Sequence, residues 1–206
     1  MRVLRSAAAA LVLALATGAA AQSGFPAVQD TSFVEANGDR VLQLTTVIDA
    51  PSTTVWEVFT TVDGWKQLGV QMAAVDFRLG GVIETNYRPE AKPGDRGNIK
   101  NQIVAYVPER LLVIRNVQAP PTFQNAEEFS RTVTVIEFEP AGVGKTRVRL
   151  SGVGFGKGPA YDDLYAKFRA GNAFTLDKLR RSWAEPGSAA EAAAESEQAA
   201  RGFERK

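Results

Sequence analysis

The chain of 206 residues contains neither cysteine nor histidine. Without cysteine it forms no disulfide, has no thiol nucleophile and offers no lipidation site after a leader. Without histidine it has no Ser-His-Asp or Cys-His nucleophilic system, no histidine-based zinc site and no imidazole proton shuttle. A domain of this length builds a sizeable core without disulfides. Any acid–base chemistry therefore falls to carboxylates, tyrosines and lysines.

An excess of charge of one sign is also lacking. The 24 lysines and arginines nearly balance the 23 aspartates and glutamates. Neither a basic surface for nucleic acid nor an acidic, solvated chain is therefore indicated. We expect no nucleic-acid partner, no metal and no cofactor.

Residues 1–21 have the order of a secretory signal peptide. Arg2 and Arg5 precede an apolar run, and small residues follow up to Ala21. The run is too short for a comfortable membrane span. We expect cleavage after Ala21 and a secreted or periplasmic location, without an integral membrane segment. The mature chain would start at Gln22, and the loss of both arginines would take its formal charge from +1 to −1. An uncleaved anchor is the alternative.

Composition divides the rest of the chain into three parts. Residues 22–39 are mixed and predict an extended lead-in. Residues 40–184 hold the regular apolar patterns and predict one domain. Residues 185–206 are dominated by alanine and glutamate. With so few large apolar side chains this last part cannot form a core, and we expect a disordered tail.

A strand at residues 41–49 is predicted from its alternation of apolar and polar residues, and Pro51 ends it. A short helix follows, with Ser52 or Thr53 as its N-cap. Its buried face consists of Val55, Trp56, Val58 and Phe59. A second short helical or irregular piece surrounds Trp65, and we expect both tryptophans in the core.

Strand patterns then follow one another. The first two, at residues 75–79 and 82–88, flank Gly80-Gly81, which predicts a tight two-residue hairpin turn. The connection at residues 118–129 is the longest and has no clear period. Further strands are expected at 98–107, 111–117, 130–139 and 146–155.

Residues 159–183 predict one long helix. At about 100° per residue, one apolar stripe is formed by Tyr161, Leu164, Tyr165, Phe168, Leu176, Leu179 and Trp183. Asn172 and Thr175 lie inside this stripe, beside Gly171. These polar side chains indicate that the helix covers something other than hydrocarbon. The alternative is a solid core in which both bond to backbone or water.

The order of elements predicts an α+β fold. Two short helices follow the first strand, and the remaining strands form one curved antiparallel sheet of about six or seven strands. The sheet wraps on the long C-terminal helix.

Two glycine-rich stretches invite a nucleotide-binding interpretation. Residues 142–146 end like a phosphate loop, but Glu139 stands where that motif has glycine. Strands are predicted on both sides, so we expect a hairpin turn there. Residues 152–158 lack the spacing of a dinucleotide-binding loop and predict a flexible connector that can act as a hinge for the long helix.

Polar residues on the strands either line a cavity or face solvent. They are Glu84, Asn86, Arg88, Lys100, Asn101, Arg115, Glu137, Arg147 and Arg149. Glu84 lies on one face of its strand and Tyr87 on the other, and alternation alone does not say which face is inward. An enzyme without histidine would use Glu84 or Tyr87 as its acid or base, with Arg115 stabilising an anion.

By these patterns the chain resembles the START-like, or SRPBCC, helix-grip superfamily. The likeness is greatest to its branch of activator-of-heat-shock-protein-ATPase homologues and polyketide cyclase-like proteins. The stretch VIDAPSTTVWEVFTTVDGW at residues 47–65 looks like the family's opening strand, Ala-Pro break and Val-Trp helix. The stretch AGNAFTLDKL at residues 170–179 is similar to its closing helix, with Asn172 where many members have tryptophan. The likeness extends over about residues 40–183.

The resemblance implies that the sheet grips the long helix and that a cavity for apolar molecules lies between them. Asn172 and Thr175 would direct a ligand there, and the loop at residues 120–129 would lie at the mouth. The residues expected at the ligand are Phe77, Tyr87, Arg115, Phe123, Phe168, Asn172 and Thr175.

The signal-peptide pattern, the polar interruption of the helix stripe and the cavity that the resemblance implies together predict an exported, periplasmic binding or carrier protein for a small hydrophobic or amphipathic molecule. One alternative is a polyketide cyclase-like or hydrolase-like enzyme, which convergence of Glu84, Tyr87 and Arg115 on one pocket would favour. Another is a protein-interaction module that docks through a sheet edge or through the tail. The family contains cyclases, hydrolases and cochaperones, so the resemblance does not choose among them.

Overall fold

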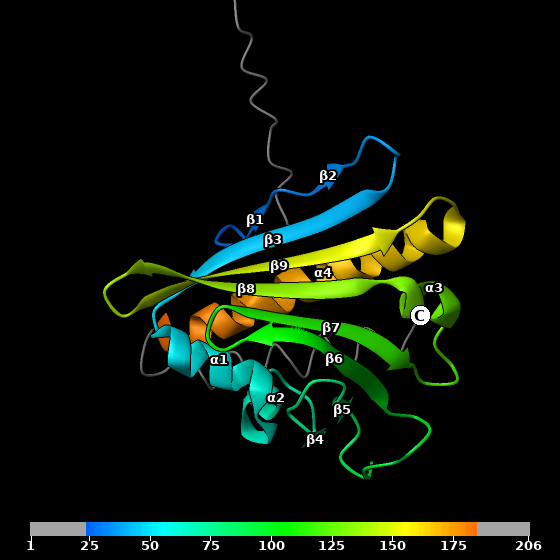
Figure 1. The fold of residues 1–206 in the computed structure, drawn as a ribbon, viewed down its shortest axis with the longest axis horizontal. Coiled ribbons are helices and arrows are strands. Elements are labelled where there is room, and N and C mark those ends of the chain that lie inside the picture. Colours follow the sequence, from blue (N-terminus) through cyan, green and yellow to red (C-terminus); the bar gives the residue numbers. More distant parts are fainter. Residues whose placement is uncertain (1–23, 185–206) are drawn as a thin grey trace, which may run out of the picture.

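One curved antiparallel sheet wraps around a long C-terminal helix in the computed structural model (Figure 1). The structure describes residues 24–184. The predicted signal peptide and the Ala/Glu-rich tail therefore lie outside the described residues. Within them the predicted α+β fold, with one sheet and one dominant helix, is confirmed.

Nine strands form the sheet of the described residues. Their spatial order is β1-β3-β9-β8-β7-β6-β5-β4, and β2 also pairs with β3. The short β1 and β2 belong to the lead-in, which pairs with the first predicted strand, and so the sheet is larger than predicted. The strands are β1 (Gln29–Asp30), β2 (Phe33–Val34), β3 (Arg40–Ile48), β4 (Met72–Val75), β5 (Val82–Asn86), β6 (Ile99–Val107), β7 (Leu111–Gln118), β8 (Val133–Gly142) and β9 (Lys145–Phe155).

The described residues also contain four helices. They are α1 (Ser52–Thr60), α2 (Val62–Gln67), α3 (Ala126–Arg131) and α4 (Pro159–Ala184). In Figure 1, α4 runs behind the sheet, α1 and α2 lie toward one end of it, and α3 lies at the other end. The bounds of the long helix agree with the prediction to within one residue. The short α3 was not predicted, because most of it lies in residues 118–129, which show no clear hydrophobic period.

The predicted N-cap of α1 is wrong. Pro51 occupies the cap position, and no side chain caps the helix. Ser52 Oγ and Thr53 Oγ1 instead donate hydrogen bonds to Glu109 Oε2 at 3.2 and 3.1 Å. Glu109 lies in the turn between β6 and β7 with a φ of 59°. The two hydroxyls therefore attach this turn to α1, where the helix macrodipole also favours a carboxylate.

The predicted two-residue turn between β4 and β5 is also wrong. The connection runs over residues 76–81. Gly80 N donates to Ile103 O at 2.9 Å, and Gly81 O accepts from Ile103 N at 2.8 Å, so both glycines extend the pairing with β6. A Cβ atom on Gly81 would come within 2.0 Å of Asp76 O. Glycine is therefore required here for a close backbone approach.

The hairpin between β8 and β9 is confirmed. Gly142 pairs with Lys145, and Gly144 at the tip has a φ of 67°, which favours glycine. Strands lie on both sides, so this turn lacks the helix N-terminus that a phosphate loop needs. Lys145 Nζ instead donates to Asp49 Oδ1 at 2.5 Å.

α4 packs its apolar stripe mainly against β3. Its best-buried apolar side chains, each at most 2 % exposed, are Leu164, Ala173, Leu176 and Leu179. The larger Tyr161, Tyr165, Phe168 and Trp183 are partly buried around them. Because burying one leucine contributes about 2 kcal/mol, this stripe anchors the helix in the sheet.

Charged contacts also hold α4 at the sheet edge. Arg169 Nε lies 2.5 Å from Asp30 Oδ2 on β1, and Arg40 Nη1 lies 2.8 Å from Asp162 Oδ1. Desolvation raises the pKa of Asp30, but hydrogen bonds from Ser32 and the interaction with Arg169 outweigh it and lower this pKa below its ordinary value. The lead-in is therefore a structural part of the domain.

Candidate functional site

A cavity of about 210 Å³ lies between α4 and the part of the sheet formed by β5 to β9. It is larger than the roughly 150 Å³ cavity that accepts benzene in an engineered protein. Its wall consists of Phe59, Trp65, Leu68, Val70, Thr85, Tyr87, Ile99, Asn101, Ile114, Asn116, Phe129, Thr132, Thr134, Ile136, Leu150, Phe168, Asn172 and Thr175. The surface of the wall is thus mostly apolar, and its eight polar residues are all uncharged.

α4 contributes Phe168, Asn172 and Thr175 to the wall. These residues share one face of the helix because they are spaced at three and four positions. Thr175 Oγ1 donates to Gly171 O at 2.9 Å, within the helix. The Asn172 amide makes no hydrogen bond within residues 24–184. Asn172 and Thr175, the two polar residues within the apolar stripe of α4, therefore face a cavity and not a filled core.

β5 shows which strand face is inward. Ile83 and Thr85 are 0 % and 3 % exposed, and Thr85 lines the cavity. Glu84 consequently points to the outer face of the sheet. Tyr87 follows at the end of this strand, and although it lines the cavity it is 61 % exposed. Its phenol ring therefore stands at the cavity mouth.

β6 and β7 place two asparagines in the wall. Asn101 and Asn116 lie on the inward faces of these strands. Asn116 is 4 % exposed, and its Nδ2 donates to Lys100 O at 3.2 Å and to Gln118 O at 3.0 Å. A register shift after Lys100 brings that carbonyl within reach. The same Nδ2 lies 3.5 Å from Asn101 Oδ1, so both N–H groups of Asn116 are engaged and its carbonyl oxygen is left for the cavity.

Aromatic side chains from the helices line further parts of the cavity. Trp65 from α2 donates from Nε1 to Phe59 O at 3.0 Å, so its polar atom is already paired. Phe129 from α3 packs against Phe168 of α4 with ring centroids 4.8 Å apart and ring planes tilted by 53°. Trp65, which we expected only as a core anchor, therefore also contributes a face to the cavity.

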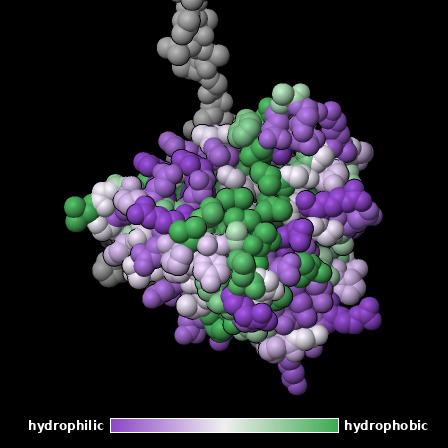
Figure 2. All heavy atoms as spheres, viewed as in Figure 1, coloured by the Kyte–Doolittle hydropathy of each residue, from purple (hydrophilic) through white to green (hydrophobic). Residues whose placement is uncertain are grey.

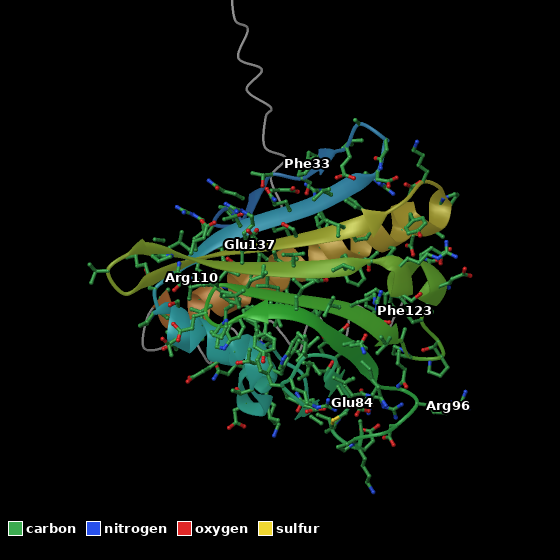
Figure 3. All side chains as sticks on the ribbon, in the orientation of Figure 1. Phe33, Glu84, Arg96, Arg110, Phe123 and Glu137 are labelled. Carbon is green, nitrogen blue, oxygen red and sulfur yellow. The ribbon has the colours of Figure 1, made fainter. Side chains whose placement is uncertain are left out.

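The structure brings four of the seven predicted ligand residues to the cavity: Tyr87, Phe168, Asn172 and Thr175. Phe77, Arg115 and Phe123 lie outside its wall. Phe77 packs on Trp56 and Tyr106, with ring centroids 5.6 and 4.9 Å away. Arg115 lies on the outer face of β7 and is exposed. Phe123 packs behind Phe129, at 5.4 Å, beside α3 (Figure 3).

Sequence reasoning missed the polar part of the wall that is formed by β7, by β8 and by the residue just before β8. Asn116, Thr132 and Thr134 were not among the predicted residues, although Asn101 was named among the polar strand positions. One signal was present: Asn116 continues the inward alternation of Leu112 and Ile114. A polar residue in an apolar phase indicates either a satisfied core group or a cavity.

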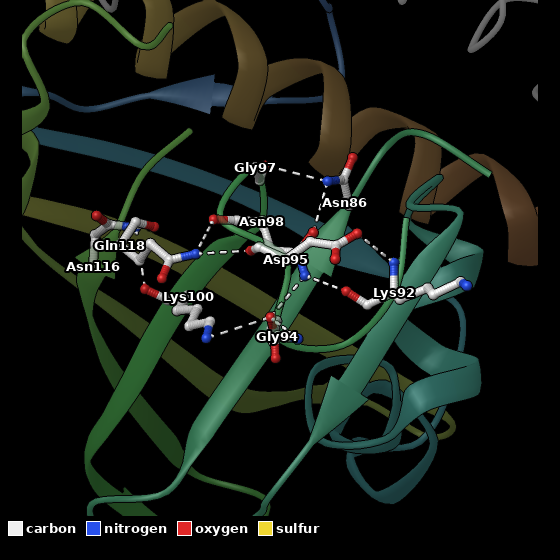
Figure 4. Close-up of polar contacts among 10 residues, drawn as sticks. Asn86, Lys92, Gly94, Asp95, Gly97, Asn98, Lys100, Asn116 and Gln118 are labelled. Atoms are coloured by element: carbon white, nitrogen blue, oxygen red, sulfur yellow. Dashed lines mark hydrogen bonds and ion pairs between the residues drawn. The ribbon is translucent and has the colours of Figure 1, made fainter. Parts of the chain in front are cut away.

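Glu84, on the outer side of β5, belongs to a structural network with Gly94, Asn98 and Lys100, which are labelled in Figure 4. Its Oε1 accepts from Asn98 Nδ2 at 2.7 Å and from Gly94 N at 2.8 Å, and Lys100 Nζ lies 3.5 Å away. Desolvation raises the pKa of Glu84, but these hydrogen bonds and the charge of Lys100 outweigh it and lower this pKa. Glu84 is thus held ionised and fixes the loop between β5 and β6.

The three side chains proposed for acid–base catalysis, Glu84, Tyr87 and Arg115, do not point into one pocket. Glu84 and Tyr87 lie on opposite faces, and Arg115 points away from the cavity. Among the described residues that line the cavity, none is aspartate, glutamate, lysine or arginine. The described residues also hold no cluster of three or more acidic side chains suited to a metal ion. The cavity can therefore accommodate a molecule, but the described part of its wall provides no carboxylate for acid–base catalysis.

An apolar stripe crosses the outer face of the sheet, which Figure 2 shows as a hydrophobic band amid polar side chains. We define the outer stripe as Val104, Val113, Val133, Val135 and Val153. Val133 pairs with Val153 and Val113 with Val135, so the stripe is continuous across β7, β8 and β9. Val104 on β6 is 43 % exposed.

Comparison with known proteins places this geometry in a family. The model of the family described as activator of Hsp90 ATPase homolog 1-like protein matches residues 49–183. The chain belongs to this family. The likeness to the START-like, SRPBCC superfamily that the sequence suggested is thereby confirmed. No curated protein matches the chain in sequence.

Solved structures share the fold of this Hsp90-activator-like domain. The Aha1 dimer from Colwellia psychrerythraea has a TM-score of 0.55 and 17 % identity, over 69 % of this chain and 95 % of that one. CalU16 from Micromonospora echinospora has a TM-score of 0.53 and 16 % identity, over 87 % of this chain and 99 % of that one. At such identities the likeness concerns the fold, which is a helix-grip arrangement.

Membership of the Hsp90-activator-like family supports a ligand-binding or cyclase-like function, and protein interaction is also compatible with it. Among residues 24–184, no helix combines the length and the apolarity needed to cross a membrane.

Proposed function

We propose that this protein is an exported binding or carrier protein for a small, mostly apolar molecule held between the sheet and α4. The observation that carries the proposal is the cavity of about 210 Å³ with its apolar wall. Ligand sites are typically concave and apolar with a few directing polar groups, which Asn116, Asn172 and the wall threonines supply here. Trp65, Phe129 and Phe168 add aromatic faces for a flat molecule.

The cavity volume limits the size of the ligand. Since about 150 Å³ accepts one benzene ring, 210 Å³ accommodates one ring or two fused rings. A long acyl chain or a four-ring polyketide exceeds this volume, unless α4 moves or the molecule extends past Tyr87. A compact aromatic or alicyclic molecule is therefore the proposed cargo.

Export is part of the proposal and is supported by the amino-terminal pattern alone. Residues 1–21 have the charged, apolar and small-residue order of a signal peptide. Mass spectrometry of the protein produced in its own host tests this point. A mature chain that starts at Gln22 is expected, and an intact Met1 terminus in the extracytoplasmic fraction would contradict cleavage.

Binding is tested with residues 22–206 and 2-naphthol, a two-ring neutral probe, by saturation-transfer NMR. Thr134 and Val135 are adjacent on β8 and point to opposite faces, so they offer a matched pair of substitutions. Thr134→Phe fills the cavity and is expected to abolish the signal, whereas Val135→Phe on the outer stripe retains it. If wild type fails to bind, or if Thr134→Phe binds equally well, a binding function in this cavity is refuted.

A protein-interaction module is the second candidate function, and the outer stripe is the observation that favours it. A continuous row of valines on the face remote from the cavity is a surface on which a partner can bury apolar area. Because the Aha1 protein from Colwellia psychrerythraea, which shares this fold, forms a dimer, the partner that we propose is a second copy of this chain. Sedimentation analysis of wild type and Val135→Glu tests it: a dimer that the variant dissociates is expected, and a monomer at all concentrations overturns it.

A further inference from the structure

We infer that the cavity selects a neutral molecule that carries a hydroxyl or N–H donor, and that Asn116 and Thr132 accept its hydrogen bonds. This inference rests on the proposed binding function and specifies the class of ligand. Three properties of the wall carry it: the lack of charge, the state of its hydrogen-bond donors, and the register of β7 and β8.

The lack of charge disfavours ionised ligands. No described residue of the wall carries a formal charge at neutral pH. The nearby ionic groups of β5 and β6 are turned outward, where Glu84 and Lys100 lie 3.5 Å apart. A carboxylate or an ammonium ion in the cavity would therefore lose its hydration without gaining a counter-charge, which is costly. A neutral ligand avoids this cost.

Several polar side chains of the wall already donate their hydrogens to backbone carbonyl oxygens. Asn116 Nδ2 donates to Lys100 O and Gln118 O, at 3.2 and 3.0 Å. Thr132 Oγ1 donates to Phe129 O at 2.8 Å, in the same manner as Thr175. Each of these side chains presents only oxygen lone pairs to the cavity. A ligand that donates a hydrogen bond satisfies them, whereas one with acceptors alone does not.

Strand register brings two of these acceptors together. β7 and β8 pair Ile114 with Thr134 and Arg115 with Val133. Continued by one residue beyond these printed pairs, the same antiparallel register brings Asn116 opposite Thr132, which immediately precedes β8, and both residues line the cavity. Side chains at directly opposed positions lie about 5 Å apart, so one ligand hydroxyl placed between these two oxygens can donate its single hydrogen to either of them or share it between both. The pair is 4 % exposed at each residue and is therefore shielded from bulk water.

The remaining polar groups of the wall accommodate the rest of such a ligand. The Asn172 amide is unpaired within residues 24–184 and can donate as well as accept, so it can meet the oxygen of a ligand hydroxyl or a second polar group. Phe129 and Phe168 supply the apolar faces for a ring. The wall is thus suited to a hydroxylated ring system of one or two rings.

The test compares three probes with the same two-ring skeleton. They are 2-naphthol, which is neutral and donates, 2-methoxynaphthalene, which is neutral and only accepts, and 2-naphthoate, which is anionic. Affinities for residues 22–206 are measured by isothermal titration calorimetry at pH 7. We expect 2-naphthol to bind about tenfold more tightly than either of the others, because one buried hydrogen bond or one avoided desolvation has roughly that value.

Two variants assign the selectivity to the proposed acceptors. Thr132→Val and Asn116→Leu each remove an acceptor with little change in volume. We expect each to reduce the preference for 2-naphthol over 2-methoxynaphthalene to about threefold or less. Thr45→Val, at an outward position of β3, is the matched control and should leave the preference unchanged. Near-UV circular dichroism verifies the fold of each variant. If Asn116→Leu does not fold, the result for Thr132→Val alone tests the assignment of the acceptors.

The outcomes separate the inference from the proposed function. If all three probes bind equally, or if 2-naphthoate binds most tightly, the inference is overturned while a binding function stands. If the preference for 2-naphthol persists in Thr132→Val, the assignment of the acceptor pair is overturned. If none of the probes binds to wild type, the proposed function itself fails, and this inference fails with it.

Discussion

Replacing Asn172 with leucine is expected to stabilise the domain while weakening ligand binding. The Asn172 amide faces the cavity without a hydrogen bond to the described residues, and a leucine of similar size would put apolar surface against Phe168 and the opposing strands. Because the residue is only half-buried, burial contributes about 1 kcal/mol. The higher helix propensity of leucine adds about 0.4 kcal/mol in the middle of α4.

The expected gain is therefore about 1.5 kcal/mol, or roughly 5 °C in the melting temperature of a domain of this size. Urea denaturation followed by tryptophan fluorescence measures the unfolding free energy, and differential scanning calorimetry measures the melting temperature. Titration with 2-naphthol on the same samples should show weaker binding. Opposite changes in stability and binding are typical of a site that keeps polar groups for function.

Ala170→Leu is the control for this experiment. Ala170 is exposed on the same helix, so a leucine there should change the unfolding free energy by less than about 0.5 kcal/mol. A loss of more than about 1 kcal/mol in Asn172→Leu would refute the reasoning. It would mean that the amide is hydrogen-bonded inside a solid core, as the alternative interpretation of the helix stripe holds.

Three further substitutions, at two positions, test the contacts that shape the domain. Arg169→Met should cost about 2 kcal/mol at pH 7, because it leaves the Asp30 carboxylate buried without its cation. The pKa of Asp30 is lowered in the folded state, so this carboxylate contributes stability above its ordinary pKa of about 4, and the contribution is lost as the pH falls through the folded-state value. The difference in unfolding free energy between Arg169→Met and wild type should therefore be smaller at pH 3 than at pH 7. An equal loss at both pH values in urea denaturation would contradict this. Asn98→Asp, which puts a second carboxylate beside Glu84, should destabilise the domain more at pH 7 than at pH 3, while Asn98→Ala should cost about 2 kcal/mol at both. If calorimetry shows Asn98→Asp to be neutral, the network around Glu84 does not fix the loop.

Local patterns predicted those elements whose stability rests on their own period. α4 was placed almost to the residue because its stripe recurs every three to four positions over 26 residues. β3 and the hairpin of β8 and β9 were predicted for the same reason, from alternation and from glycines at the turn. α3 has only six residues and little periodicity, and so it was missed.

Long-range contacts decided the local features that were predicted wrongly. The hydroxyls of Ser52 and Thr53 have the chemistry of an N-cap, but Glu109, which is 57 and 56 positions away, receives their hydrogen bonds. Gly80 and Gly81 have the composition of a tight turn, but they pair with β6 instead. A local rule cannot include a partner that only the folded sheet brings near.

The sequence by itself determined the α+β order of elements, the polar interruption of the long helix and the absence of histidine chemistry. The tertiary structure alone decided which strand face is inward, because alternation defines two faces and only the curvature of the sheet around α4 chooses between them. That choice turned Glu84 and Arg115 away from the cavity and brought Asn116 and Thr132 into its wall. Whether Asn172 faces a solid core or a hollow depended in turn on how completely side chains from distant strands fill the space beneath the helix.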